Sequence, residues 1–169
     1  MALREILQAP HPALKTVAAP VAEVTEEIRA LMADMLETMY KAPGIGLAAP
    51  QIGVQKRLVV ADLGREEARA PMFLVNPELL WASDETEVLE EGCLSLPEQF
   101  ADVRRPVRVR VRYTDLDSAA QEVEADGLLG RCLQHEIDHL NGILFIDHLS
   151  ALRRNMILRK LAKARRGRA

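Results

Sequence analysis

Two histidines one helical turn apart are the strongest chemical signal in this sequence. His135 and His139 enclose Glu136 in the segment HEIDH, residues 135–139. At 100° per residue of an α-helix, the two imidazoles lie about 40° apart on one face. They can bind one metal ion while the Glu136 carboxylate reaches a water bound to that ion. The pattern predicts a hydrolytic metal centre; a pair of core or capping histidines is the alternative.

Such a centre needs a third ligand from elsewhere in the chain. No Glu follows His139, and His148 comes nine residues after it rather than six, so neither the gluzincin nor the metzincin pattern is complete. Cys93, in the segment EGCLS (residues 91–95), is the best remaining candidate. A thiolate and two imidazoles form a soft ligand set that leaves a position open for water. The alternative for Cys93 is packing as a small buried side chain.

A glycine-rich segment, GIGLAAPQIG at residues 44–53, is the third feature. It lacks the Lys-Ser/Thr pair of a phosphate-binding loop and the strand that precedes one. Exposed backbone for a peptide-like substrate is the other interpretation, with Gln51 as a neutral side-chain donor.

Periodicity predicts the elements that carry these segments. Apolar residues at helical spacing over Thr25–Tyr40 predict a helix capped by Thr25, whose methionine stripe faces the core. A second helix is expected from Asp126 to Leu140, and a third after Ser150. Short segments rich in β-forming residues predict strands: Arg57–Asp62, Met72–Asn76, Thr86–Leu89, Val107–Tyr113 and Gln121–Ala125. We expect an α+β fold in which antiparallel sheets pack around the metal-binding helix, with an N-terminal helix and a basic C-terminal helix.

Length and composition set outer bounds. The chain of 169 residues is 49% hydrophobic and 28% charged, which is ordinary for a globular protein, and we expect one domain over residues 1–169. Its longest apolar runs are four residues, whereas a membrane-spanning helix needs about 20. The N-terminus lacks the apolar stretch of a secretory signal, so we expect a cytoplasmic protein.

Charge is distributed unevenly along the chain. Residues 150–169 contain eight Lys and Arg residues and no Asp or Glu, although the net charge of the whole chain is −3. The other residues hold the remaining 14 of 22 basic residues and all 25 acidic ones, a net charge of −11. This asymmetry indicates a polyanionic partner for the C-terminal end; a solvated basic helix is the alternative.

In this order and at these spacings, the segments GIGLAAPQ (44–51), EGCLS (91–95) and HEIDH (135–139) resemble the signature motifs of peptide deformylases. The resemblance runs from about Leu3 to the basic C-terminus. It includes residues 38–40, 76–77, 97–99 and 124–129. One departure outside the motifs is Gly130, where Ala is more usual.

The resemblance implies removal of the N-formyl group from the initiator methionine of nascent bacterial polypeptides, with release of formate. It implies one divalent metal ion, natively Fe(II), with Zn, Ni or Co able to replace it. Cys93, His135 and His139 match the ligands, and Glu136 matches the general acid and base. Gln51 and the backbone N–H of Leu94 match the donors to the developing oxyanion.

Peptide binding is expected to resemble strand addition, with backbone pairing to Ile45–Gly46 and Leu89–Glu91. Leu128 and Cys132 precede His135 by seven and three residues, which places them on the metal-facing side of the helix. With Ile45 and Leu89 they are candidates for the methionine pocket; ordinary core packing is the alternative for each.

We therefore predict formyl-methionyl nascent peptides as substrates and a monomer without membrane association. The C-terminal helix is expected to bind the ribosome, with Leu152, Met156, Leu161 and Ala164 on one apolar face. Two alternatives remain: a metallopeptidase that cleaves internal bonds, and a catalytically idle homologue that binds the ribosome.

Overall fold

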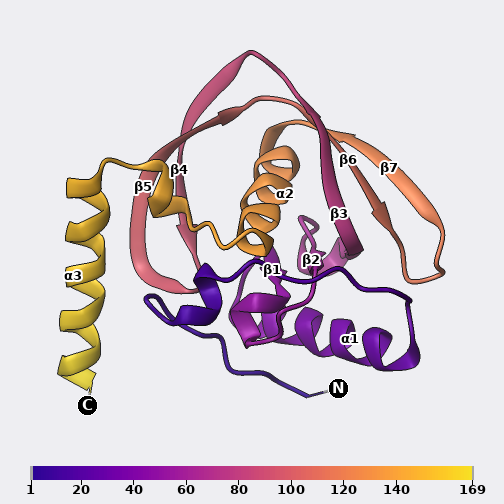
Figure 1. Ribbon diagram of the computed structural model, residues 1–169, viewed down its shortest axis with the longest axis horizontal. Coiled ribbons are helices and arrows are strands. Elements are labelled where there is room, and N and C mark those ends of the chain that lie inside the picture. Colours follow the sequence, from indigo (N-terminus) through magenta and orange to yellow (C-terminus); the bar gives the residue numbers. More distant parts are fainter. Residues whose placement is uncertain (1, 169) are drawn as a thin grey trace.

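The helix that carries the HEIDH segment, α2 (Gly127–Leu140), lies between two antiparallel sheets in the computed structural model, which describes residues 2–168 (Figure 1). One sheet has five strands in the order β1-β2-β3-β6-β7, and the other is the β4-β5 hairpin. The strands are β1 (Gly46–Ala48), β2 (Leu58–Ala61), β3 (Met72–Ala82), β4 (Thr86–Cys93), β5 (Leu96–Pro106), β6 (Val109–Thr114) and β7 (Ala120–Ala125). The predicted α+β class with antiparallel sheets is confirmed.

Helix α1 (Glu26–Lys41) forms where helical periodicity predicts it. The hydroxyl of Thr25 accepts a hydrogen bond from the N–H of Ile28 at 3.3 Å, so Thr25 is the N-cap. The methionine stripe is fully buried and packs against β2. These methionines are therefore core residues. Leu47 and Ala49 of the glycine-rich segment belong to the same cluster, so α1 packs against that segment.

Helix α2 begins and ends on close backbone contacts. A Cβ on Gly130 would lie 2.8 Å from the carbonyl oxygen of Ala125, so the first turn packs directly on the end of β7 and has no room for Ala. At the other end, Gly142 has φ +73°, the left-handed conformation that ends many helices. Arg57 donates to the carbonyl of Leu140 at 3.0 Å. These contacts fix the position of both histidines along the helix axis.

Two strands escape prediction from the sequence, and two others extend beyond it. Strand β1 has three residues, all buried, too few to show alternation. Strand β5 contains Pro97 and several charged residues, yet alternate residues face the core from Ala101 to Arg105. Strand β3 extends the predicted Met72–Asn76 to Ala82, and β4 extends the predicted Thr86–Leu89 to Cys93. The β4-β5 hairpin therefore carries the metal-ligand candidate Cys93 at its turn end.

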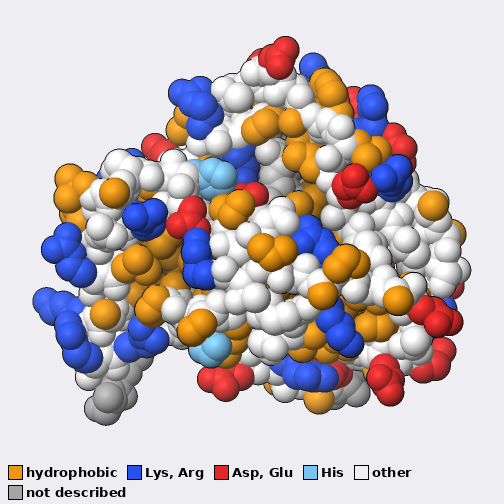
Figure 2. All heavy atoms as spheres, viewed as in Figure 1, with side chains coloured by type: hydrophobic (Ala, Val, Ile, Leu, Met, Phe, Trp, Pro, Cys, Tyr) orange, Lys and Arg blue, Asp and Glu red, His pale blue; other side chains and the backbone are white. Residues whose placement is uncertain are grey.

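Helix α3 (Ala151–Arg168) lies at the edge of the molecule, alongside β5 and the short 3-10 helix at Phe145–His148 (Figure 1). Ile157 and Leu161 are its buried residues. The expected face was wrong: Leu152 is 69% and Met156 45% exposed. At 100° per residue, Leu152 and Leu161 lie about 180° apart, so they cannot share a face. Figure 2 shows Lys and Arg side chains along this edge.

Candidate active site

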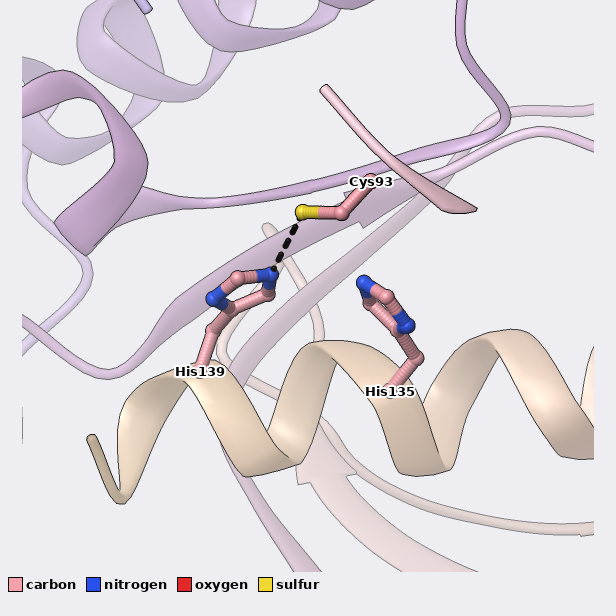
Figure 3. A group of neighbouring side chains, drawn as sticks. All are labelled: Cys93, His135 and His139. Atoms are coloured by element: carbon pink, nitrogen blue, oxygen red, sulfur yellow. Dashed lines mark hydrogen bonds between the residues drawn. The ribbon is translucent and has the colours of Figure 1, made fainter. Parts of the chain in front are cut away.

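Cys93, His135 and His139 converge from two elements that are distant in sequence. Cys93 ends β4, and the histidines lie one turn apart on α2 (Figure 3). One candidate ligand atom from each residue lies within 4.8 Å of the other two. The Sγ of Cys93 is 3.3 Å from Nε2 of His139. A thiol and two imidazoles at this spacing fit a single divalent ion of borderline softness.

His135 is oriented by a buried carboxylate. Its Nδ1 lies 3.0 Å from Oε1 of Glu91, which leaves Nε2 for a metal ion. Glu91 is itself held by the guanidinium groups of Arg105 and Arg131. Burial alone would raise the pKa of Glu91, but hydrogen bonds from His135 and Arg105 bring the pKa well below its ordinary value. Glu91 is therefore a carboxylate.

His139 has a different environment. Burial lowers the pKa of His139 well below its ordinary value, and the charges of His135 and Arg105 act in the same direction. A neutral imidazole is the form that binds a metal ion. Its Nδ1 is buried and has no hydrogen-bond partner among the described residues.

Glu136 lies next to the cluster, with a carboxyl group shielded from solvent. Its Oε1 is buried and unpaired within the described part of the chain. Burial raises the pKa of Glu136 to about 7, a value suited to taking and giving a proton near neutral pH. A Cβ on Gly46 would lie 2.6 Å from Oε2 of Glu136 and 2.8 Å from Sγ of Cys132. Strand β1 therefore passes directly over this face of α2, and a larger residue would displace it.

Gln51 lies in the 3-10 helix Ala49–Ile52, with its amide group turned toward the cluster. Its Oε1 accepts a hydrogen bond from the N–H of Ala48 at 2.9 Å, which fixes the amide orientation. The Nε2 donates to Oγ of Ser95 at 3.1 Å and lies 3.6 Å from Sγ of Cys93. Gln51 is almost completely buried, so it is a rigid donor beside the candidate metal site.

A cleft of about 700 Å³ opens above these groups. Its walls contain the predicted residues Ile45, Gly46, Gln51, Glu91, Cys93, Leu94, Leu128, Cys132, His135 and Glu136. His139 and Leu89 are not among the residues that line the cleft; His139 is buried behind the wall, in contact with Cys93. Burial raises the pKa of the Cys132 thiol well above its ordinary value, with the charge of Glu136 adding to the shift. Cys132 is thus a neutral, apolar wall residue.

Several lining residues were not foreseen from the sequence. The β5 end of the hairpin contributes a wall of four residues: Pro97, Glu98, Gln99 and Phe100. The ring of Phe100 covers Gly92, where a Cβ would lie 2.6 Å from Cε1 of the ring. A local signal for this wall is Gly92, because a glycine inside a strand often marks close approach by another group.

A family model described as "Polypeptide deformylase" matches residues 3–155 of this chain. The chain belongs to the peptide deformylase family. It is 59% identical over 164 residues to a peptide deformylase of Phenylobacterium zucineum (strain HLK1), and the match covers 96% of this chain and 97% of that protein.

Solved deformylase structures have the same fold. A peptide deformylase from Legionella pneumophila superimposes with a TM-score of 0.92 at 45% identity, covering 99% of this chain and 98% of that one. A peptide deformylase from Ehrlichia chaffeensis in complex with actinonin gives a TM-score of 0.91 at 40% identity, covering 97% and 98%. Family membership and the Cys93, His135 and His139 group together indicate a single metal ion in the cleft. Among the described residues, no helix is long and apolar enough to cross a membrane.

Proposed function

We propose that this protein removes the N-formyl group from formyl-methionyl nascent peptides and releases formate. The observation that carries the proposal is the group of Cys93, His135 and His139 beside a cleft whose walls include Cys93, His135, Glu136 and Gln51. Deformylation needs an activated water, a proton carrier and donors to the carbonyl oxygen. Cys93, His135 and His139 could hold the ion that activates the water, Glu136 could carry the proton, and Gln51 could be one of the donors. The family to which the chain belongs supports the same reaction.

Cys93, His135 and His139 would hold the metal ion. When bound, such an ion lowers the pKa of a coordinated water and polarises a carbonyl group. As the family resemblance implies, we expect Fe(II) as the native ion, with Zn, Ni or Co able to replace it; thiolate and imidazole donors are compatible with such ions.

Glu136 is proposed to carry the proton. Its carboxylate takes a proton from the attacking water and donates it to the amine nitrogen of methionine as the C–N bond breaks. A pKa near 7 allows both steps, because neither protonation state is strongly disfavoured at neutral pH. Because the Glu136 carboxyl group is buried, bulk water cannot exchange protons with it during the transfer.

Gln51 and the backbone N–H of Leu94 are proposed to stabilise the carbonyl oxygen as it gains charge. The hydrogen bond from the Ala48 N–H to Oε1 of Gln51 keeps the Nε2 group facing the site, so little reorganisation is needed during the reaction. Each such donor contributes about 3 kcal/mol in measured oxyanion holes. A neutral amide also avoids repulsion of the metal ion, which a Lys would cause.

The substrate peptide is proposed to lie along the cleft as an added strand, with its backbone pairing to Ile45–Gly46 and Leu89–Glu91. Ile45, Leu128 and Cys132 line the same cleft, which supports them as walls of the methionine pocket. The Leu89 side chain is exposed on β4, so we assign this residue a role through its backbone alone.

Helix α3 is proposed to bind the ribosome, where nascent peptides emerge. Six of its cationic residues are exposed: Arg153, Arg159, Lys160, Lys163, Arg165 and Arg166. Such a row of cations is attracted to RNA phosphates, while the acidic remainder of the chain is repelled. We further propose a monomer that acts in the cytoplasm.

The deciding experiment compares two substrates with protein purified and analysed for metal under anaerobic conditions. We expect formate release from a formyl-methionyl tripeptide and no cleavage of an internally quenched peptide. Cleavage of the quenched peptide would instead identify a metallopeptidase. A metal-loaded protein inactive on both would identify an idle binding homologue.

A further inference from the structure

An unbroken chain of ionic hydrogen bonds connects the candidate metal site to the far side of α2. Glu91 accepts from His135 at one end, and Arg105 bridges Glu91 to Asp138. The Nε2 of His148 lies 2.8 Å from Oδ2 of Asp138 and forms the outer end. The family motifs contain Glu91 and Asp138, but neither Arg105 nor His148 lies in a motif.

Arg105 holds both oxygens of the Glu91 carboxylate. Its Nε donates to Oε2 at 2.5 Å and its Nη2 to Oε1 at 2.9 Å, a two-point contact that fixes the plane of the group. Oε1 is also the atom that accepts from His135. Arg131, the other guanidinium at this carboxylate, reaches only Oε2. Of the two arginines, Arg105 is therefore the one that sets the direction of the hydrogen bond to His135.

Arg105 also ties together the two elements that supply the ligands. It lies on β5 of the hairpin that ends in Cys93, and its Nη1 donates to Oδ2 of Asp138 on α2 at 2.9 Å. The side chain is 4% exposed, so water cannot substitute for these contacts. A change at Arg105 alters both the orientation of His135 and the attachment of the hairpin to α2.

We propose that Arg105 is a positioning residue for the metal centre, acting through Glu91 on His135 and through Asp138 on the approach of β4 to α2. The inference rests on the proposed function, because it takes His135 as a ligand. His139 has no comparable anchor at Nδ1 within the described residues, so the rigidity of the ligand pair depends on His135.

The test measures zinc affinity by competition with a chromophoric chelator, together with the melting temperature of the metal-free protein. Arg105→Gln is expected to weaken zinc binding 10- to 100-fold, the usual loss when the partner of a ligating histidine is disturbed. Arg105→Lys retains the charge but cannot grip two carboxylate oxygens in one plane. We expect the melting temperature of Arg105→Lys to be close to that of the wild type, and its zinc affinity to be at least tenfold lower than that of the wild type.

Two further variants grade the effect along the chain of contacts, and a third serves as the control. Asp138→Asn is expected to weaken zinc binding several-fold and His148→Gln less than twofold, because His148 is farthest from His135 in the network. The matched control is Arg104→Gln, since Arg104 is the exposed neighbour whose side chain hydrogen-bonds only to Thr86 among the described residues. Zinc affinity of this control should equal that of the wild type.

Two results would overturn the inference. The first is zinc affinity within twofold of wild type in a folded Arg105→Gln or Arg105→Lys protein. Either result would show that the two-point contact between Arg105 and the Glu91 carboxylate is unnecessary. The second is an equal loss in Arg104→Gln, which would indicate a general charge effect. His135→Ala separates these failures from failure of the proposed function: if that variant keeps zinc, the ligand set itself is wrong.

Discussion

At the scale of single residues, the proposed proton carrier is separable from the proposed ligands. Glu136→Gln preserves the size of the side chain and removes its ability to carry a proton. We expect normal metal content, measured by mass spectrometry, and less than a tenth of the wild-type rate of formate release. Turnover above that level would show that another group moves the proton.

The two cysteines provide a matched pair of substitutions, because both line the cleft and only Cys93 belongs to the ligand group. Cys93→Ser should sharply reduce metal content, since a hydroxyl is a much poorer ligand than a thiolate. Cys132→Ser should retain the metal and mainly raise KM for formyl-methionyl peptides, because it places a hydroxyl in an apolar wall. Equal loss of metal in both variants would contradict the assignment.

At the scale of elements, Asp62 fastens the segment after β2 to α1. Its carboxylate accepts hydrogen bonds from the hydroxyl of Tyr40 at 2.5 Å and from the N–H groups of Gly64 and Ala70. Burial raises the pKa of Asp62, but the hydrogen bond from Tyr40 and the backbone bonds outweigh it, and the pKa is lowered. The folded state then binds this proton less readily than the unfolded chain, so the carboxylate stabilises the protein above its unfolded pKa.

The stabilisation by Asp62 is therefore lost as the pH falls through its folded pKa. Asp62→Asn should lower the free energy of unfolding by about 2 kcal/mol at pH 7, the typical contribution of hydrogen bonds to a charged group. The deficit should persist at pH 5 and shrink below pH 4. Urea unfolding at each pH measures it, with exposed Asp84→Asn as the control. A deficit independent of pH would show that the charge of Asp62 is not responsible.

Elements with strong local patterns were predictable from sequence, and contacts between elements were not. Helix α1 follows from apolar periodicity and its capping residue Thr25, and α2 closely matches the predicted range Asp126–Leu140. The spacing of His135 and His139 predicts their shared face. Strand β1 is too short to show a period. Arg105 lies outside the family motifs, and its proposed role depends on the β4-β5 register and on the packing of α2 against the hairpin. Local sequence encodes neither.

At the scale of the whole molecule, the exposed cations of α3 are proposed to decide where the enzyme works. Removing the helix would uncover the core around Ile157 and Leu161, so substitution is a cleaner test than truncation. Changing the six exposed Arg and Lys residues to Gln should leave formyl-dipeptide turnover unchanged, because none of them lines the cleft. Co-sedimentation with ribosomes should fall, and binding by the wild type should weaken steeply with added salt.

A matching set of six changes to Gln among exposed acidic residues far from the cleft provides the control for altered surface charge. The control should keep or strengthen ribosome binding. If the α3 variant binds ribosomes as the wild type does, with no dependence on salt, the helix is not the docking element.

Because the proposed ligands come from two separate segments, we expect metal binding to depend on folding. Cys93 and His139 are 46 residues apart in sequence and meet only when the hairpin packs against α2. The unfolded chain therefore has no complete site, and a metal ion binds almost exclusively to the folded state. By mass action, each tenfold rise in free metal above the dissociation constant adds about 1.4 kcal/mol to the free energy of unfolding. A cell short of the ion would thus lose both the reaction and part of the thermodynamic protection of this chain against unfolding and proteolysis.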